Sequence, residues 1–353
     1  MKTQEHRIWH VLLAAAALLA LTAQNASGPI FATLQLGMVQ WTQASHVAAL
    51  TQWALPVFTA LAGSIFLASS RAWNLRTLWR QVIPSVALSC VFWWCAAAVI
   101  YLQKHHPQEM DVSTFMQCLG MVLSEPANIG YCQMLVSMFL LYPLLRQVAL
   151  NRQVTGYCLA ALFMVNVALP LLRLIPGGTT VTLFTNQLNW GYFRTWAFYL
   201  LLGVFLTEQP LSWPVRLAVY CAGIVSTGLM AALTSWQTTA ATGFCQDYLG
   251  MHSPFTAAQA AAVFLLFRQL PARLKAPRLT RVLRGMWMCP PAAAVMYTLS
   301  SRFLPAYDGH LIRHTAVHMA ADTLMTIGLV AALGALPGFR RLVGDYHAGG
   351  EKR

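Results

Sequence analysis

Four residues capable of acid–base chemistry recur at every fourth position near the C-terminal end of the chain. The segment 310–322 reads HLIRHTAVHMAAD and contains His310, His314, His318 and Asp322. On a helix, each step of four residues advances about 40°, so these side chains form a slanted ridge about 18 Å long. The ridge is too long for all four to reach one metal ion, but His314, His318 and Asp322 make two adjacent pairs.

Three interpretations of these pairs are open. A His-x3-His spacing is typical of metal ligands on a helix. The same spacing lets Asp322 orient and charge the imidazole of His318 as a general base, while His314 passes protons outward. The structural alternative places His310 and His314 at the lipid headgroups and leaves His318 and Asp322 in an interhelical hydrogen bond. We favour acid–base chemistry over metal binding and expect no metal.

Membrane-spanning helices must position this ridge. The chain has 353 residues, of which 58% are hydrophobic and 9% charged, whereas a soluble domain carries about 25% charged residues. Asp322 is the only acid well inside a predicted span, where an ionisable group is costly. Ten apolar stretches approach the ~20 residues that cross a bilayer: 8–24, 50–69, 80–101, 130–148, 154–175, 191–207, 214–235, 251–268, 284–304 and 317–336. These stretches predict an all-α polytopic membrane protein with about ten transmembrane helices and one domain over residues 1–353.

The basic residues predict the orientation of these helices. With ten spans and the N-terminus inside, 18 of the 23 lysines and arginines fall on the cytoplasmic side. The other 5 are Lys104, Arg173, Arg194, Arg302 and Arg313. This asymmetry follows the positive-inside rule and predicts that both termini are cytoplasmic. The net charge of +13 therefore reflects topology, and no nucleic acid partner is expected.

Two segments contain further candidates for binding. The basic segment 268–284 includes Arg278 and Arg281, and it fits either anionic lipid or an anionic cytosolic ligand such as a nucleotide-bearing donor. On the predicted outer side, Trp190 and Tyr192 lie near Arg194. Because sugar rings stack on aromatic side chains, these three residues are candidate substrate contacts, although a membrane-interface aromatic belt also explains tryptophans at such positions.

Glu125 is a further acid in a predicted outer segment, directly before Pro126. A helix-cap or loop role fits it better than catalysis, and contact with the substrate is the functional alternative. Glu125 and the residues near Arg194 are thus candidate substrate contacts that are predicted to lie on the non-cytoplasmic side.

Five segments, taken in order, carry a resemblance to a known family. They are LPVFTALAGSIFL (55–67), RQVIPSV (80–86), NIGYCQMLVSMFLLYPLL (128–145), YLLLGVFL (199–206) and PGFRRLVG (337–344). They resemble signatures of the integral-membrane acyltransferase 3 family, which includes surface-polysaccharide O-acyltransferases. The resemblance covers nearly the whole chain and agrees with ten spans and two cytoplasmic termini.

The chain departs from this family at the usual histidines. Members typically carry an Arg-x10-His pair in the first helix, but here Arg7 is followed eleven residues later by Leu18. Gln24 and Asn25 are the nearest polar residues to the end expected for that helix. Neither amide titrates near pH 7, so neither supplies a general base.

Two other family histidines are also replaced. The histidine of the HLW signature corresponds to Asn128, and the histidine after the ninth helix corresponds to Ser300. Such side chains keep hydrogen-bonding capacity but lose base chemistry near neutral pH. The His318–Asp322 pair is therefore the strongest candidate for a relocated base.

The resemblance implies an O-acyltransferase of the bacterial inner membrane. Its donor would be acyl-CoA, with an acetyl group expected, and its acceptor a cell-envelope polysaccharide or a lipid-linked precursor. Arg76, Arg80, Arg278 and Arg281 could hold the donor phosphates. Membrane lipids and polysaccharide-synthesis proteins are the other expected partners.

Two further functions remain open from the sequence. Loss of the histidines also fits a non-catalytic subunit of a polysaccharide assembly or secretion complex. The ridge at 310–322 by itself fits a transporter for protons or a cation.

Overall fold

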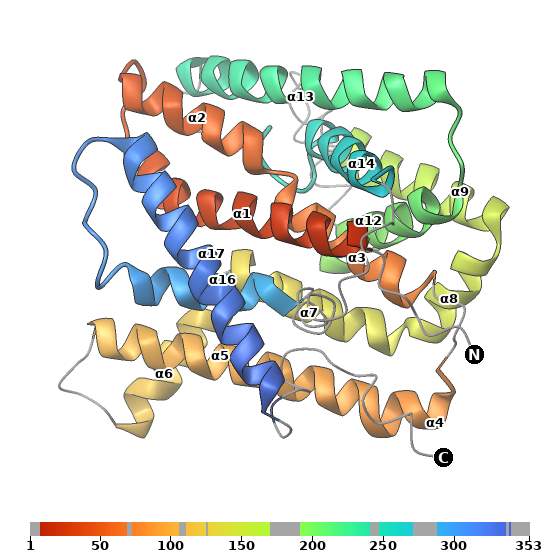
Figure 1. The fold of residues 1–353 in the computed structure, drawn as a ribbon, viewed down its shortest axis with the longest axis horizontal. Coiled ribbons are helices and arrows are strands. Elements are labelled where there is room, and N and C mark those ends of the chain that lie inside the picture. Colours follow the sequence, from red (N-terminus) through yellow and green to blue (C-terminus); the bar gives the residue numbers. More distant parts are fainter. Residues whose placement is uncertain are drawn as a thin grey trace.

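The computed structural model describes residues 8–68, 73–105, 111–124, 126–169, 191–240, 247–270 and 288–336 together with Phe339; it describes only the backbone at 104–105, 124, 126–129, 191–195 and 240. Within these ranges every regular element is a helix (Figure 1). The α-helices are α1 (Ile8–Phe31), α2 (Val39–Thr51), α3 (Ala54–Phe66), α4 (Leu75–Thr77), α5 (Ile83–His105), α6 (Val112–Ser124), α7 (Pro126–Leu140), α8 (Tyr142–Leu150), α9 (Arg152–Phe163), α12 (Gly191–Glu208), α13 (Trp213–Ala240), α14 (Pro254–Arg268), α16 (Cys289–Ser300) and α17 (Leu311–Ala335). Two π-helical turns are η1 (Leu78–Val82) and η2 (Met164–Ala168).

Long apolar helices give the fold the character of a membrane-embedded protein. In the described part of the chain, five helical segments are long and apolar enough to cross a bilayer, or six if the bent pair α7–α8 counts as one. Each of the ten stretches predicted from hydropathy coincides with a helix over at least part of its length. Ten crossings remain a prediction, because α14 and α16 have only 15 and 12 residues and a helix rises about 1.5 Å per residue.

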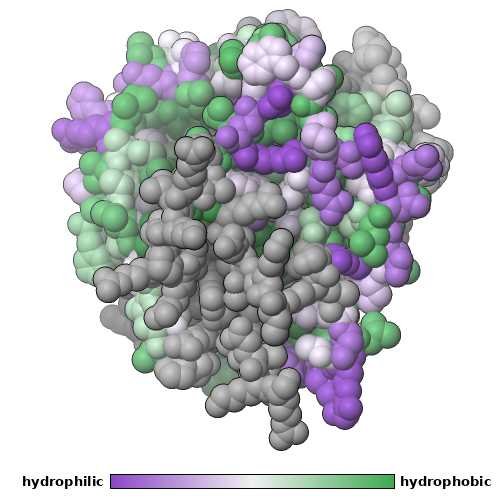
Figure 2. Space-filling model, turned by 45° about the vertical axis from the view of Figure 1, so that its right-hand side comes forward, coloured by the Kyte–Doolittle hydropathy of each residue, from purple (hydrophilic) through white to green (hydrophobic). Residues whose placement is uncertain are grey.

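Segments predicted for the same side of the membrane gather at the same end of the bundle (Figure 1). The start of α2, the end of α5 and the α16–α17 connection lie at the left in this view, whereas α4, the α8–α9 turn and the α12–α13 link lie at the right. Figure 2 turns the right-hand side forward and shows hydrophilic side chains over part of it, with hydrophobic ones alongside. Exposed residues in these right-hand segments include Arg76, Arg80 and Arg152.

Prolines explain two interruptions that hydropathy does not predict. The axes of the helical segments Gly130–Leu140 and Tyr142–Leu150 meet at 75°, because Pro143 lacks the N–H that would bond to the carbonyl of Phe139 and its ring crowds that carbonyl. The π-helical turn η1 ends two residues before Pro84, which lacks the N–H that would bond to the carbonyl of Arg80. The predicted span 130–148 is therefore a broken helix rather than a straight one.

The first helix is longer than predicted, which corrects the position assigned to Gln24 and Asn25. It runs through Pro29 to Phe31 rather than ending near residue 24. Phe31 is 2% exposed, and its ring lies 5.4 Å from that of Trp41 in α2. This contact stabilises the last turn, so both amides lie within α1 and not at its end.

Two glycines allow α3 and α12 to pack backbone to backbone. A Cβ atom at Gly63 would collide with the backbone of Leu200, and one at Gly203 would collide with the backbone of Ala60. These glycines belong to two of the segments that carry the family resemblance. Small residues at such crossings let helices approach closely in a membrane, where apolar burial contributes little to helix association.

Candidate functional site

The buried face of α17 is polar, although the helix as a whole is apolar. Its buried residues are Leu311, Thr315, His318, Asp322, Thr323, Thr326 and Val330, and the exposed ones include Ile312, Val317 and Leu324. Polar groups in a membrane helix turn inward because hydrocarbon offers them no partner. The four-residue spacing predicted from sequence thus places His318, Asp322 and Thr326 on one inward-facing stripe.

His318 and Asp322 form the buried centre of this stripe. Their side chains are 2% and 0% exposed, and His318 Nδ1 lies 3.6 Å from Asp322 Oδ2. Ser300, at the end of α16, places its Oγ 3.3 Å from the same Nδ1 atom. The structure therefore brings three of the predicted catalytic residues together from two helices.

Aromatic and imidazole rings surround His318. The ring of Tyr297 lies 5.6 Å from it in an edge-on contact, and the ring of His314 lies 4.4 Å away. Because Nδ1 is next to Asp322 and Ser300, the tautomer with its proton on Nδ1 is favoured, which leaves a basic lone pair on Nε2.

Helix α1 closes the other side of the stripe. Thr22 and Thr323 share a hydrogen bond of 2.9 Å between their hydroxyls. The Thr22 hydroxyl also lies 3.1 Å from the carbonyl of Leu18 and 3.4 Å from that of Met319. Leu18, the position that corresponds to the family's first-helix histidine, is therefore one turn of α1 from the contact with α17.

Several buried polar atoms along the stripe lack a hydrogen-bond partner among the described residues. They are Thr315 Oγ1, both carboxylate oxygens of Asp322 and Thr326 Oγ1. Each such atom costs about 1–3 kcal/mol when it is left unsatisfied. A row of them on consecutive turns is expensive for a purely structural helix, which favours a functional role for the stripe.

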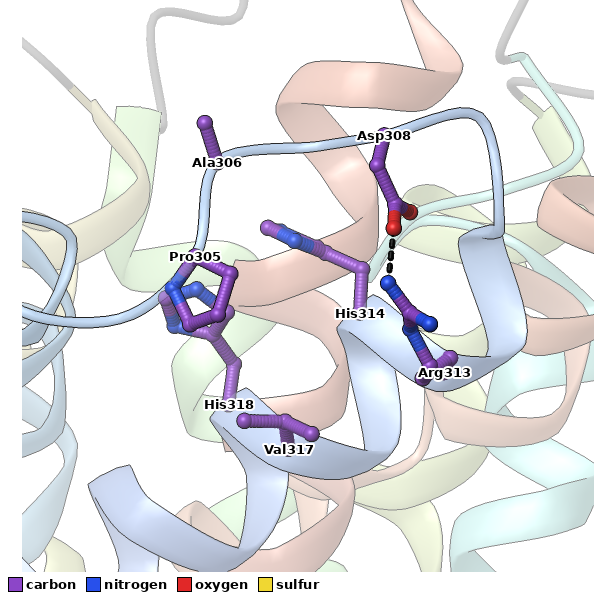
Figure 3. A pocket seen from close by; sticks show the side chains of 7 residues that line it. All are labelled: Pro305, Ala306, Asp308, Arg313, His314, Val317 and His318. Carbon is purple, nitrogen blue, oxygen red and sulfur yellow. Dashed lines mark hydrogen bonds and ion pairs between the residues drawn. The ribbon is translucent and has the colours of Figure 1, made fainter.

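A pocket opens from this stripe at the N-terminal end of α17 (Figure 3). It is lined by Pro305, Ala306, Asp308, Arg313, His314, Val317 and His318 and encloses about 260 Å³, counting the part open to solvent. In Figure 3 the side chain of His314 points toward the loop at Ala306, and His318 lies behind Pro305. Since His318 is only 2% exposed, it forms the floor of the pocket.

Asp308 lies at the mouth of the pocket, and the sequence did not predict it as a site residue. Asp308 accepts a hydrogen bond of 3.2 Å from the backbone N–H of His310 and pairs with the guanidinium of Arg313. The backbone N–H bond, together with the positive charge of Arg313, holds the pKa of this carboxyl below its ordinary value. The signal in the sequence was Asp308-Gly309 at a turn, since Gly309 has a φ of 89° that other residues rarely adopt.

Three other predicted residues, one in the ridge and two in α1, lie apart from the His318–Asp322 contact. His310 precedes the first turn of α17 and is exposed, so it lies outside the buried stripe. Gln24 donates a 3.2 Å hydrogen bond to Gln52. Asn25 has a buried Nδ2 without a partner in the described part of the chain, one turn along α1 from Thr22.

Of the four arginines predicted to bind the donor phosphates, two lie in the described part of the chain. Arg76 and Arg80 are exposed in α4 and η1, at the end of the bundle opposite the α16–α17 connection (Figure 1). Arg278 and Arg281 lie outside the described residues.

The outer substrate candidates stay predictions. Trp190 and Glu125 lie outside the described residues, and Asn128, Tyr192 and Arg194 lie in helices at positions where only the backbone is described. Within the described ranges, no group of three or more His, Cys, Asp or Glu side chains is arranged to hold a metal ion.

Comparisons with known protein families, with curated proteins and with solved structures find no match for this chain. The function must therefore be inferred from the arrangement of the helices and of the site residues. This arrangement defines, in the described part of the chain, a helical protein with membrane-type helices and a buried imidazole–carboxylate pair whose histidine lines a pocket.

Proposed function

We propose that this protein is a membrane-embedded O-acyltransferase in which His318 is the general base and Asp322 orients it. The observation that carries the proposal is the buried contact of Asp322 with His318, which lies at the floor of a pocket. A carboxylate beside Nδ1 fixes the imidazole tautomer and stabilises the imidazolium that forms when Nε2 accepts a proton. The neutral imidazole then presents Nε2 to a ligand in the pocket.

The reaction transfers an acyl group from a thioester to a hydroxyl. His318 takes the proton from the acceptor hydroxyl as its oxygen attacks the acyl carbonyl carbon. A C–O bond forms, the C–S bond of the thioester breaks, and the leaving thiolate recovers the proton from His318. The products are the O-acyl ester and free coenzyme A.

The tetrahedral oxyanion of this reaction needs a hydrogen-bond donor. We assign this role to Asn25, because its buried Nδ2 has no partner among the described residues. Thr22, one turn earlier on α1, contacts Thr323 of α17, and residues three apart lie on neighbouring parts of a helix face.

The donor in this proposal is acyl-CoA, probed as acetyl-CoA, and the acceptor is a cell-envelope polysaccharide or its lipid-linked precursor at the bacterial inner membrane. Arg76 and Arg80 support a donor site because they are exposed at the end of the bundle opposite the pocket. Guanidinium groups bind phosphates through paired hydrogen bonds. Asn128 and Ser300 remain hydrogen-bonding residues of the proposed site rather than bases.

The first test is transfer of radiolabelled acetyl groups to the envelope polymer of cells that express variants. His318→Gln and Asp322→Asn should each lower transfer by about 10²-fold or more, the range of general-base catalysis. His310→Gln is the matched control, since this histidine is exposed outside the stripe, and it should keep wild-type transfer. Full transfer by both variants at 318 and 322 would disprove the assignment.

Proton movement is a second candidate function, favoured by one observation. The rings of His314 and His318 lie 4.4 Å apart and connect the pocket with the buried carboxylate of Asp322 in a continuous row. A transporter of this kind would move protons into liposomes without acyl-CoA, and His314→Gln would slow it.

A non-catalytic subunit is the remaining alternative. A wild-type protein that shows neither transport nor turnover, but that co-purifies with a polysaccharide-synthesis protein, would indicate this function.

A further inference from the structure

The pocket above His318 offers a specific combination of charges. Asp308 carries one negative charge and Arg313 one positive charge, and the two are paired. The other polar lining residues are the imidazoles of His314 and His318, so the carboxylate and the guanidinium are the permanent charges of this lining and they offset each other. An anionic ligand would meet Asp308 at the mouth and the field of Asp322 behind the floor, while a cationic ligand would meet Arg313. The pocket therefore suits an uncharged ligand.

The pocket also offers hydrogen-bond acceptors and donors side by side. A carboxylate has about four acceptor positions, of which Asp308 uses one for the His310 N–H and one for Arg313. A guanidinium has five N–H donors, and Arg313 has one hydrogen bond within the described part of the chain. Each hydroxyl both donates and accepts, so neighbouring hydroxyls on a ring match an adjacent carboxylate and guanidinium.

The remaining walls fit the carbon face of such a ring. Pro305, Ala306 and Val317 are apolar and line the same pocket. The volume of about 260 Å³ includes space that is open to solvent, so a ligand would lie across the mouth of the pocket rather than be enclosed in it.

The Asp308–Arg313 pair lies at the mouth of the pocket (Figure 3), so a ligand there would meet a carboxylate and a guanidinium side by side.

We propose that this pocket binds one uncharged sugar ring through Asp308 and Arg313, with a ring hydroxyl directed at His318. The ring is the terminal or exposed unit of the acceptor, so this inference rests on the proposed function. It assigns the acceptor to neutral, hydroxyl-rich glycans rather than to sugars that carry carboxylate or phosphate.

Saturation-transfer NMR on the purified full chain in detergent tests this assignment without turnover. The neutral probe is methyl α-D-glucoside and the anionic probe is methyl α-D-glucuronide. The glucoside should receive saturation from the wild-type protein, and the glucuronide several-fold less. Asp308→Ala and Arg313→Ala should each weaken glucoside binding about fivefold, the loss expected for one net hydrogen bond.

The controls separate this inference from the proposed function. Ile312→Ala alters an exposed neighbour on α17 that does not line the pocket, and it should bind the glucoside as the wild type does. His318→Gln should keep most glucoside binding, because its amide can still form a hydrogen bond with a ring hydroxyl, while it lowers acyl transfer by about 10²-fold or more. Absence of glucoside binding, equal binding by Asp308→Ala, or stronger binding of the glucuronide would overturn the assignment even if acyl transfer is found. Glucoside binding by a wild-type protein that transfers no acyl group would instead refute the proposed function alone.

Discussion

At the scale of single residues, Asp322 owes its influence on His318 to the lack of other partners. Neither of its carboxylate oxygens has a hydrogen bond among the described residues, and its nearest ionisable contact is His318 Nδ1 at 3.6 Å. A buried carboxylate stabilises a nearby positive charge more strongly than an exposed one, because the local dielectric constant is low. The buried contact is therefore arranged so that Asp322 can orient the imidazole of His318, as the proposed function requires.

A pH prediction at this scale concerns Asp308, outside the membrane helices. Its pKa is lowered from 3.8 by the hydrogen bond from the His310 N–H and by the charge of Arg313. A lowered pKa means that the carboxylate's contribution is fully present above 3.8 and is lost as the pH falls through the lower, folded-state value. The part of glucoside binding that depends on the Asp308 carboxylate should thus be retained from pH 7 to about 4 and should decline only below that range.

The pH dependence of the NMR signal provides the check. In Asp308→Asn the acid decline should disappear, because the amide does not titrate. The same pH dependence in the wild type and in Asp308→Asn would contradict the role given to Asp308.

Part of the candidate site could be predicted from sequence and part could not. The spacing of four residues predicted the His318–Asp322 contact, because helix geometry alone brings i and i+4 together. The roles of Asp308 and Arg313 depend on the path of the loop before α17, including the positive φ of Gly309. That path results from tertiary contacts, so residue spacing carried no information about it.

At the scale of helices, the closest contact is the crossing of α3 and α12. Gly63 and Gly203 each leave no room for a Cβ atom beside the opposing backbone. Since backbone cannot rotate aside as a side chain does, any larger residue must push the helices apart.

Gly203→Ala should therefore destabilise the protein by about 1–3 kcal/mol, the usual cost of overpacking. Thermal unfolding in detergent, followed by circular dichroism, should show a lower midpoint. Gly156→Ala in α9 is the matched control, since no atom lies within 4 Å of its added Cβ; it should leave the midpoint unchanged or raise it slightly. Equal midpoints for Gly203→Ala and the wild type would show that α3 and α12 are not packed this closely.

Hydropathy predicted where helices occur, but not their lengths or bends. The extension of α1 to Phe31 depends on its contact with Trp41, a residue of another helix. The 75° bend before α8 depends on Pro143, and a proline can end, kink or begin a helix according to the surrounding packing.

At the scale of the whole molecule, segments that the charge distribution predicts for the same side of the membrane also lie at the same end of the helix bundle. The α4, α8–α9 and α12–α13 segments lie at one end of the bundle and the α16–α17 connection at the other (Figure 1). If the chain crosses the membrane ten times, the distribution of 18 basic residues against 5 predicts that these ends are the cytoplasmic and the outer side. The donor and acceptor sites that we propose would then lie at opposite ends, as a transfer reaction across a membrane requires.

This topology predicts the behaviour of reporter fusions. Green fluorescent protein fused after Arg353 should fluoresce, and alkaline phosphatase at the same position should be inactive, because both termini are expected in the cytoplasm. Alkaline phosphatase inserted after Ala306 should be active. Active phosphatase at the C-terminus would contradict ten spans with both ends inside.

The most direct test of the central claim is acetyl transfer by the purified protein in liposomes. The measurement follows the release of coenzyme A from acetyl-CoA and the appearance of labelled acetyl esters on an envelope glycan extract. Wild-type protein should produce both in equal amounts, and His318→Gln should produce each at least about 10²-fold more slowly. Equal rates for the two proteins would contradict His318 as the base that drives acyl transfer.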